Sequence, residues 1–397
     1  MDNPANPLDR EFLTEGEAAP GLPVFCLERW QSTLENSAKY LLSESGVEPP
    51  AAEMLTELGV DLDVRSAVLG YGWTLGEPGL RESVASVYYR GLVDSEQVII
   101  TTGSAEANLL SVISLVAPGD RVLFDMPNYM QIHGLLRMRG ARILEAWRKR
   151  EHRWKLDPGL YAELIKREKP RAVFITNPNN PTGSVAGPKA LGEIAAEAAR
   201  TGSILVFDEL YRGLEHSTEP APTVLEPALE QGAHAISVSG LSKVYGLPGL
   251  RIGWAAATSR RLRDRMWMVK DYTTISPPKP SEHIAEQILE KGVWKKLAER
   301  GRRIVLSNLE ILEDLTTRFR TAKLWRPDAG AYALVETTVG DTLSFAYKLY
   351  QTHSILVNPG ECFKLPGTIR LGLGHENRES FKKSVALTLN FLESFAG

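Results

Sequence analysis

The sequence predicts an α/β protein, with a large domain built on a mostly parallel sheet and a smaller α+β domain formed by both ends of the chain. Two observations lead to this prediction. From about Val98, short β-branched runs alternate with amphipathic helical segments, as in VIITTG followed by SAEANLLSVISLVA. The runs are almost continuously apolar, which is typical of strands covered on both faces. Alternation of strand and helix favours parallel pairing with right-handed crossovers.

The expected elements follow in chain order. After a loose arm of about 20 polar, proline-rich residues, we expect a helix in VFCLERWQSTLENSAKYLL, residues 24–42. Buried strands are expected in VIIT, RVLFDM, RAVFIT, SILVFDE, AISVSG and IGWAAA, and after ISPPKP the chain turns helical. We therefore expect an N-terminal arm and part of the small domain over 1–54, a large domain over 55–285, and the rest of the small domain over 286–397.

Composition limits the possible functions. The chain has 397 residues, of which 43% are hydrophobic and 24% charged, with a net charge of −3. This balance is ordinary for a globular protein and favours a small-molecule partner over nucleic acid. The N-terminus lacks a signal-peptide pattern and no stretch reaches the length of a membrane span, so we expect a cytoplasmic protein with no membrane partner.

Cysteine and histidine residues show no metal-like grouping. Cys26 and Cys362 are the two cysteines, and no CxxC motif occurs. We therefore expect neither a disulfide framework nor a zinc site. The seven histidines are scattered, and no metal site is predicted.

Sheets of this kind bind ligands at the carboxyl ends of their strands. Lys243 follows one such strand in SVSGLSKVYGLPGLRIGW, and Arg251 is the eighth residue after it. A desolvated lysine amine can form an imine with a carbonyl compound, and a guanidinium nearby can grip a phosphate. Without these neighbours, Lys243 would be interpreted as a solvated loop residue.

Two more segments end strands with polar side chains. In VFDELYRGL, Asp208 follows a buried strand and precedes Tyr211. A buried carboxylate needs a cationic partner, which a protonated pyridine nitrogen would supply; a helix N-cap is the alternative. In ITNPNNPTG, prolines and a glycine predict a rigid turn around Asn180, which conformation alone would also explain.

These segments resemble the S-x-x-K…R, D-E-x-Y and N-P-x-N-P-T-G motifs of class I/II aminotransferases, which are fold-type I enzymes dependent on pyridoxal 5′-phosphate (PLP). The resemblance runs from about Phe25 to the C-terminus. KYLLSESGVEP, SKVYGLPGLRIGW and VKDYTTIS are also similar to the subgroup that contains capreomycidine synthase. The resemblance implies the PLP-dependent transferase fold, PLP as cofactor, and a homodimer with active sites shared across the interface.

The resemblance also implies roles for individual residues. Lys243 would hold PLP as a Schiff base and act as general base, and Asp208 would pair with the ring nitrogen. Tyr211 and Asn180 would bond the ring oxygen, with Asn180 also near the substrate carboxylate. Arg251 would bind the phosphate.

The phosphate site and the ring have further expected partners. In TTGSAEANLL, Gly103, Ser104 and Ala105 lie at a strand-to-helix junction, where backbone N–H groups and the helix dipole favour an anion. This turn matches the family's phosphate cradle. Tyr129 in DMPNYMQIHG matches the aromatic residue that stacks on the cofactor ring, and His133 is expected beside it.

Two expected residues belong to the dimer and to the substrate. Tyr71 in YGWTLGEPGLR would cross the interface to bond the neighbour's phosphate, and Arg370 in GTIRLGLG would clamp the substrate α-carboxylate. The family usually has Ser or Thr three residues before the lysine, whereas this chain has Gly240 there. Ser239 and Ser242 are the candidate replacements for the missing hydroxyl.

The function implied by the resemblance is transfer of an amino group between an L-amino acid and a 2-oxo acid. The alternative is a PLP-dependent cyclase, eliminase or replacement enzyme of natural-product biosynthesis, similar to capreomycidine synthase. A third hypothesis is a regulator with a PLP-binding fold, but the N-terminal arm is too short for the DNA-binding domain that such proteins carry. Side-chain specificity is not predicted. Arg318, Arg320 and Arg326 are candidates for a dicarboxylate-binding arginine, and the resemblance of LWRPDAGAYALVE to an active-site strand of the family implies that Gly330 and Tyr332 shape the substrate pocket.

Overall fold

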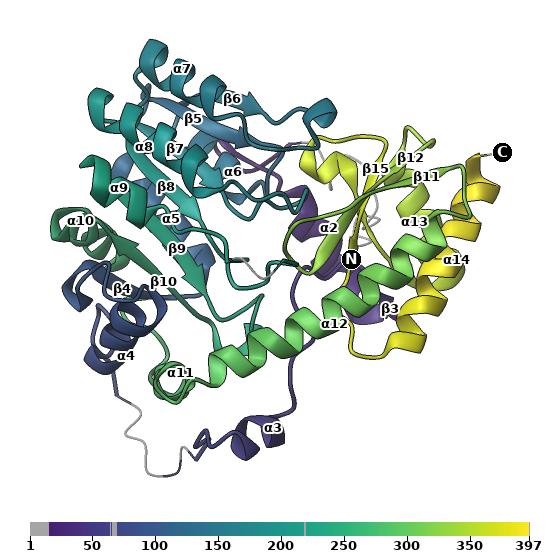
Figure 1. The fold of residues 1–397 in the computed structure, drawn as a ribbon, viewed down its shortest axis with the longest axis horizontal. Coiled ribbons are helices and arrows are strands. Elements are labelled where there is room, and N and C mark those ends of the chain that lie inside the picture. The colour runs from purple at the N-terminus through teal and green to yellow at the C-terminus, as the bar shows by residue number, and fades with distance from the viewer. Residues whose placement is uncertain (1–15, 64, 66–69, 218–219, 397) are drawn as a thin grey trace, which may run out of the picture.

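The structure is a computed structural model that describes residues 16–63, 65, 70–217 and 220–396. The first 15 residues of the expected N-terminal arm therefore lie outside it. The described chain is built around a seven-stranded sheet with the order β4-β10-β9-β8-β7-β5-β6 (Figure 1). Its strands are β4 (Val98–Thr102), β5 (Arg121–Met126), β6 (Arg142–Trp147), β7 (Ala172–Thr176), β8 (Ile204–Asp208), β9 (Ala235–Gly240) and β10 (Ile252–Ala257).

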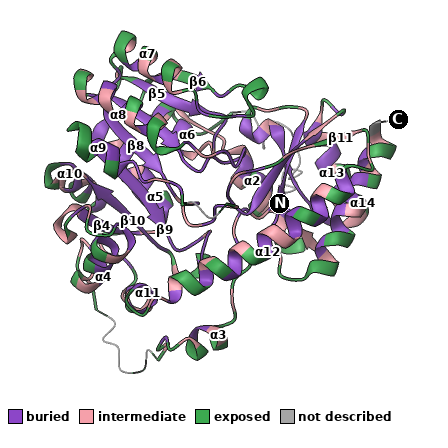
Figure 2. Ribbon diagram, viewed as in Figure 1, coloured by how far each residue is buried: buried purple, intermediate pink, exposed green. Residues whose placement is uncertain are grey.

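The seven-stranded sheet is mostly parallel, as the sequence predicts. The pairs along β6-β5-β7-β8-β9 are parallel, and β10 is antiparallel to both β9 and β4. Because successive side chains of a strand point to opposite faces, Val173 and Ile175 of β7 join one hydrophobic cluster, whereas Phe174 joins the other. Figure 2 shows the central strands almost wholly buried. The continuous apolar runs thus form strands covered on both sides.

Helices cover both faces of this sheet. One face carries α7 (Pro158–Glu168), α8 (Pro188–Thr201) and α9 (Leu225–Gln231), and α8 contacts both of the others. The other carries α5 (Ser104–Leu115), α6 (Gln131–Met138) and α10 (Arg260–Lys270). The N-terminus of α5 directly follows β4, which places its first turn at the edge where the parallel strands end.

A four-stranded antiparallel sheet with the order β11-β12-β15-β14 forms the centre of the second part. Its strands are β11 (Ala322–Trp325), β12 (Tyr332–Thr337), β14 (Asn358–Pro359) and β15 (Thr368–Gly372). Helices α12 (Val293–Thr316), α13 (Thr342–His353) and α14 (Arg378–Ala396) accompany it. Figure 1 shows α12 running from α11 (Lys279–Glu290) toward α14. The expected domain boundaries at 54/55 and 285/286 stay predictions.

Both ends of the described chain contribute to this second part. The strand β3 (Tyr40–Leu41) pairs in parallel with β13 (Ile355–Leu356). The helix expected over 24–42 is shorter: α2 (Cys26–Leu34) ends before a 3₁₀ turn at Glu35–Ser37. Asn and Ser are weak helix formers, and pairing with β13 draws the following residues into an extended conformation.

Short elements complete the described chain. These are β1 (Glu17–Ala19), β2 (Leu22–Pro23), α3 (Ala52–Glu57), α4 (Pro78–Ser83), a π-helical turn at Val84–Tyr88, and 3₁₀ turns at Ser95–Gln97, Arg150–His152, Pro248–Leu250 and η6 (Gly360–Phe363). Among the described residues, no helix is long and apolar enough to cross a membrane, and no group of three or more His, Cys, Asp or Glu side chains is arranged to hold a metal ion.

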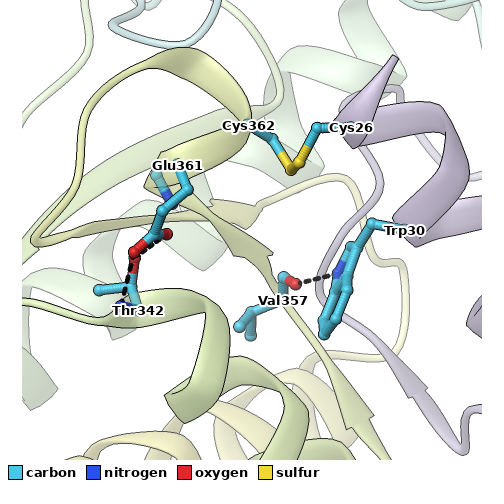
Figure 3. Close-up of a disulfide and its surroundings, with 7 residues drawn as sticks. Cys26, Trp30, Thr342, Val357, Glu361 and Cys362 are labelled. Atoms are coloured by element: carbon cyan, nitrogen blue, oxygen red, sulfur yellow. Dashed lines mark hydrogen bonds between the residues drawn. A yellow bond between two sulfur atoms is a disulfide. The ribbon is translucent and has the colours of Figure 1, made fainter. Parts of the chain in front are cut away.

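The prediction that the cysteines form no disulfide was wrong. Cys26 at the start of α2 and Cys362 in η6 are bonded, with their Cα atoms 5.1 Å apart although the residues are 336 positions apart in the sequence (Figure 3). Nearby, the Trp30 indole donates a 2.8 Å hydrogen bond to the Val357 carbonyl. The pair forms because α2 packs against the C-terminal part, and no local spacing motif encodes a contact over such a separation.

Candidate active site

A cavity of about 460 Å³ lies at the carboxyl ends of the parallel strands. Nine of the eleven residues predicted for the site line it: Ser104, Ala105, Tyr129, Asn180, Asp208, Tyr211, Lys243, Arg251 and Arg370. They come from both parts of the chain, since Arg370 lies on β15 and the others follow strands of the large sheet. The structure thus brings together residues from positions 104 to 370 around one space.

Asp208 ends β8 and is buried. Its Oδ2 accepts a 3.0 Å hydrogen bond from Asn108 Nδ2, and its Oδ1 accepts a 3.1 Å bond from the Leu210 amide. Burial raises the pKa of Asp208, and the two hydrogen bonds oppose this rise. Within the described ranges no salt bridge reaches this carboxylate, so a cationic group on a ligand would offset the cost of burying its charge.

Asn108 is a site residue that the sequence analysis missed. It lies on α5 one turn after Ser104, and its Nδ2 is also 3.3 Å from Gln131 Oε1. Its Oδ1 is buried and has no hydrogen-bond partner among the described residues. The usable signal was helical spacing, because residues four apart on a helix share a face.

Arg370 is buried on β15. Its Nη1 donates to Asn180 Oδ1 at 2.9 Å and its Nη2 to the Ser43 carbonyl at 2.8 Å, whereas Nε is buried without a partner in the described chain. The guanidinium lies 5.6 Å from the ring centre of Tyr332 and 5.1 Å from that of Phe363. Burial lowers the pKa of Arg370. The Arg370 guanidinium is therefore buried, and it does not lie at the surface of the molecule.

Two tyrosines face the cavity. The Tyr211 hydroxyl donates to Ser45 Oγ at 2.9 Å, and its ring meets Tyr332 edge-on at 4.8 Å. The Tyr129 hydroxyl donates to Glu28 Oε1 at 2.6 Å. Burial, followed by the neighbouring Glu28 carboxylate, raises the pKa of Tyr129 well above its usual value. Glu28 was not predicted, because α2 reaches the site only through packing of the chain ends.

The residues predicted for the phosphate cradle lie together at the start of α5. Gly103 precedes the helix with a φ of 76°, and a Cβ there would lie 2.4 Å from Arg251 Nη2. A Cβ on Gly253 of β10 would lie 2.3 Å from the Ser104 amide nitrogen. The glycines let the guanidinium and the β10 backbone approach the first turn of α5, whose N–H groups have no partner within the helix. This arrangement suits an anion.

The structure explains why glycine occupies position 240. A Cβ on Gly240 would lie 2.9 Å from the Ile252 carbonyl oxygen and 3.0 Å from Gly253 Cα, so β10 leaves no room for a hydroxyl-bearing side chain. The Ser239 hydroxyl is buried, 2.9 Å from that of Tyr88. Of the two candidate replacements, Ser242 is the one that lines the cavity.

Lys243 lies in the loop after β9 and is half-buried. Its carbonyl accepts a 2.9 Å hydrogen bond from the Val47 amide, and a Cβ on Gly46 would lie 3.3 Å from its Cδ. Segment 46–47 therefore packs along the lysine. Lys243 lines a second cavity of about 760 Å³ as well as the first.

Other candidates lie elsewhere. Tyr71 is 85% exposed and does not line the cavity of its own chain. His133 is not beside the site as expected, because its Nε2 bonds Glu145 at 3.0 Å and it lines a separate cavity. Arg318 and Arg326 make surface ion pairs with Asp314 and Glu313.

Comparison with known proteins places this site in a family. Residues 42–381 match the model of aminotransferase class I and II. The chain is 28% identical to valine–pyruvate aminotransferase of Mycobacterium tuberculosis, over 85% of this chain and 87% of that one. Capreomycidine synthase of Streptomyces vinaceus is 27% identical over 90% and 91%.

A solved structure agrees with these sequence relatives. A PLP-dependent aminotransferase from Streptococcus suis superposes with a TM-score of 0.86 at 31% identity, covering 94% of this chain and 98% of that one. The fold is therefore fold type I, and the cofactor is pyridoxal 5′-phosphate. The chain belongs to the class I and II aminotransferase family.

Proposed function

We propose that the chain is an aminotransferase that moves an amino group between an L-amino acid and a 2-oxo acid. The observation that carries this proposal is that Lys243, Asp208 and Arg370 line one cavity. The cavity offers an amine, a buried carboxylate, and a buried guanidinium, which are the groups that this reaction needs. Among the described residues the carboxylate has no cationic partner and the guanidinium Nε has no hydrogen-bond partner.

The residues present fit PLP. The first turn of α5 and Arg251 offer donors to a phosphate, and Asp208 offers a carboxylate to a protonated ring nitrogen. The bound cofactor supplies an electron-poor ring that accepts the negative charge developed at the substrate Cα. Tyr129 from the loop after β5 would cover the ring, and Ser242 would add a hydroxyl near the phosphate.

The protein's own groups then bind the substrate and move its proton. Arg370 would hold the α-carboxylate through its Nε and an Nη group, with Asn180 keeping the guanidinium in place. This fixes the direction of the Cα–H bond. The Lys243 amine, once freed from the cofactor, would take the Cα proton as general base.

The test is Lys243→Ala, compared with Lys189→Ala on the exposed face of α8. We expect Lys243→Ala to lose the visible-edge absorbance of the lysine-bound cofactor and to stop amino transfer from any donor to pyruvate or 2-oxoglutarate. Lys189→Ala should keep both. Full turnover in Lys243→Ala would contradict the assigned role.

A second candidate is cyclisation, elimination or replacement, which the similarity to capreomycidine synthase favours. The same proton removal by Lys243 would precede each of these outcomes. Incubation with amino acids in the absence of a 2-oxo acid separates them. Accumulation of the aminated cofactor supports transfer, whereas release of a cyclised or eliminated product with the cofactor unchanged supports the alternative.

We also propose that the protein works in the cytoplasm. We further propose that it forms a dimer in which a second copy of the chain covers an exposed apolar patch, defined by Tyr71, Trp73, Met268, Tyr272 and Ile275. Tyr71 and Tyr272 are 85% and 91% exposed. The Trp267 indole donates to Thr74 Oγ1 at 2.8 Å, which joins the two segments of the patch. Met268→Glu should convert a dimer into monomers in light scattering; an unchanged mass would count against this interface.

A further inference from the structure

The second cavity, which Lys243 also lines, adjoins the cofactor cavity. The two share Glu28, Ser242, Lys243, Pro248 and Arg251. A substrate whose amine approaches Lys243 therefore has about 760 Å³ of space on the far side of that lysine. We therefore consider the residues that line this space as candidates for contact with the side chain of the amino donor.

Three half-buried carboxylates stand on this wall, and we call them the acidic wall: Glu28 of α2, Glu35 of the following turn, and Glu44 after β3. Burial raises the pKa of Glu35, and the neighbouring Glu44 and Glu28 charges raise it further, while Lys243 opposes them. The charges of Glu28 and Glu44 thus both act on Glu35. In the part of the chain that the structure describes, no salt bridge reaches any of them.

The cations around this cavity do not neutralise the acidic wall once the cofactor is bound. Lys243 and Arg251 are the proposed partners of the cofactor's aldehyde and phosphate. Lys39 is exposed, with its amine 5.5 Å from the Tyr40 ring centre. Burial lowers the pKa of His375, which favours the neutral form of its ring. Glu48 adds a fourth carboxylate, which accepts a 2.8 Å bond from the Glu376 amide.

A second and independent observation locates the opposite end of the ligand. Arg370 is 1% exposed, lines the cofactor cavity, and has a buried Nε without a partner among the described residues. It is an anion-binding group, and Glu28 lines the same cavity. The space therefore presents a site for a carboxylate at one end and negative charge at the other.

We infer that the amino donor is an amino acid whose side chain ends in a cation, an amine or a guanidinium, held by the acidic wall of Glu28, Glu35 and Glu44. This inference rests on the proposed function for the orientation of the substrate. Half-buried carboxylates without a cationic partner among the described residues are costly, even though Glu28 accepts a hydrogen bond from Tyr129. A cationic side chain would remove that cost. The same charges disfavour dicarboxylic donors.

The test compares L-arginine with L-citrulline, which has nearly the same shape but a neutral end. Binding is measured by titration calorimetry on the holoenzyme after borohydride reduction, which prevents turnover. We expect arginine to bind roughly tenfold or more tightly than citrulline, as charge-assisted hydrogen bonds imply. Arginine binding should weaken with added sodium chloride, while citrulline binding should not.

Variants locate the effect. Glu35→Gln with Glu44→Gln should remove most of the preference for arginine and leave citrulline binding unchanged, whereas Glu57→Gln on the exposed face of α3 should change neither. Equal binding of arginine and citrulline to the unaltered protein, without salt dependence, would overturn the inference. The calorimetry does not depend on turnover, so loss of amino transfer would count against the proposed function alone. The salt series is measured on the unaltered protein. It can therefore refute the inference even if the double variant misfolds.

Discussion

Asp208 shows how a single residue depends on neighbours that the sequence does not announce. Its position after an apolar strand predicts that it is buried at a sheet end, and the structure places it there. Its charge is supported by Asn108 and the Leu210 amide. Asn108 belongs to none of the sequence motifs described above. It contacts Asp208 because α5 follows β4, and β4 lies in the same sheet as β8, which Asp208 ends.

Asn108→Ala should shift the pH dependence of the reaction. Loss of the 3.0 Å hydrogen bond removes a contribution that lowers the pKa of Asp208. The carboxylate would then be protonated at a higher pH, so the acid limb of kcat/KM should move upward. At pH values on the acid limb we expect kcat/KM to fall roughly fivefold, which corresponds to the loss of about one hydrogen bond. Ser114→Ala, at the other end of α5, should leave the profile unchanged, and an unmoved limb in Asn108→Ala would contradict the role.

Gly253→Ala should damage the phosphate cradle. The new Cβ would lie 2.3 Å from the Ser104 amide nitrogen, which is backbone and cannot swing away. We expect a loss of about 1–3 kcal/mol in the free energy of unfolding and weaker PLP binding in a fluorescence titration. Gly187→Ala is the matched control, since its Cβ would meet nothing within 4 Å. Equal cofactor affinity in the two variants would show that the close approach is unimportant.

At the scale of elements, apolar runs predict the large sheet well, because each central strand is itself a short, continuous run of apolar residues that is buried on both faces. The strands of the second part are harder to predict. β3 and β13 have two residues each and exist only as partners of one another. Hydrophobic periodicity cannot detect a strand of two residues. Because β3 was not detected, the predicted helix was extended past Leu34 to residue 42. Elements defined by a distant partner are therefore the ones that the sequence analysis missed.

Helix α11 carries a buried acid that gives a prediction about stability. Glu282 is fully buried; its Oε1 accepts a 2.9 Å bond from the Glu77 amide, and its Oε2 has no partner among the described residues. Burial raises the pKa of Glu282 from 4.5 to about 7. The folded chain therefore holds a proton that the unfolded chain releases, so stability falls as the pH rises from about 4.5 to 7.

Glu282→Gln should remove this pH dependence. Glutamine keeps the oxygen that accepts from Glu77 but carries no charge, so the variant should exceed the parent by about 1–3 kcal/mol above pH 7 and match it near pH 4. Urea unfolding across this range measures the difference. Glu290→Gln, exposed at the end of the same helix, should follow the parent. A constant offset between Glu282→Gln and the parent would contradict the assigned pKa.

At the scale of the whole molecule, the site is completed by the meeting of the two chain ends. The sequence predicts that both ends form the small domain, and Arg370 was found because it lies in an apolar strand motif. Glu28 and the disulfide were not found, because contacts between residues 26–28 and 362 follow from the packing of α2 on η6. Three-dimensional packing alone carries that information.

The disulfide allows a prediction that concerns the whole chain. It closes a loop spanning 336 positions, and the loop-entropy model gives about 6 kcal/mol for a loop of this length. Protein purified in air and alkylated before digestion should yield linked peptides containing Cys26 and Cys362, and dithiothreitol should lower its Tm. The double variant Cys26→Ser/Cys362→Ser should show the lower Tm at once and no response to dithiothreitol. Free thiols in the air-purified protein would contradict the bond. A bond already present in protein alkylated at lysis would argue against the proposed cytoplasmic location, because that compartment keeps thiols reduced.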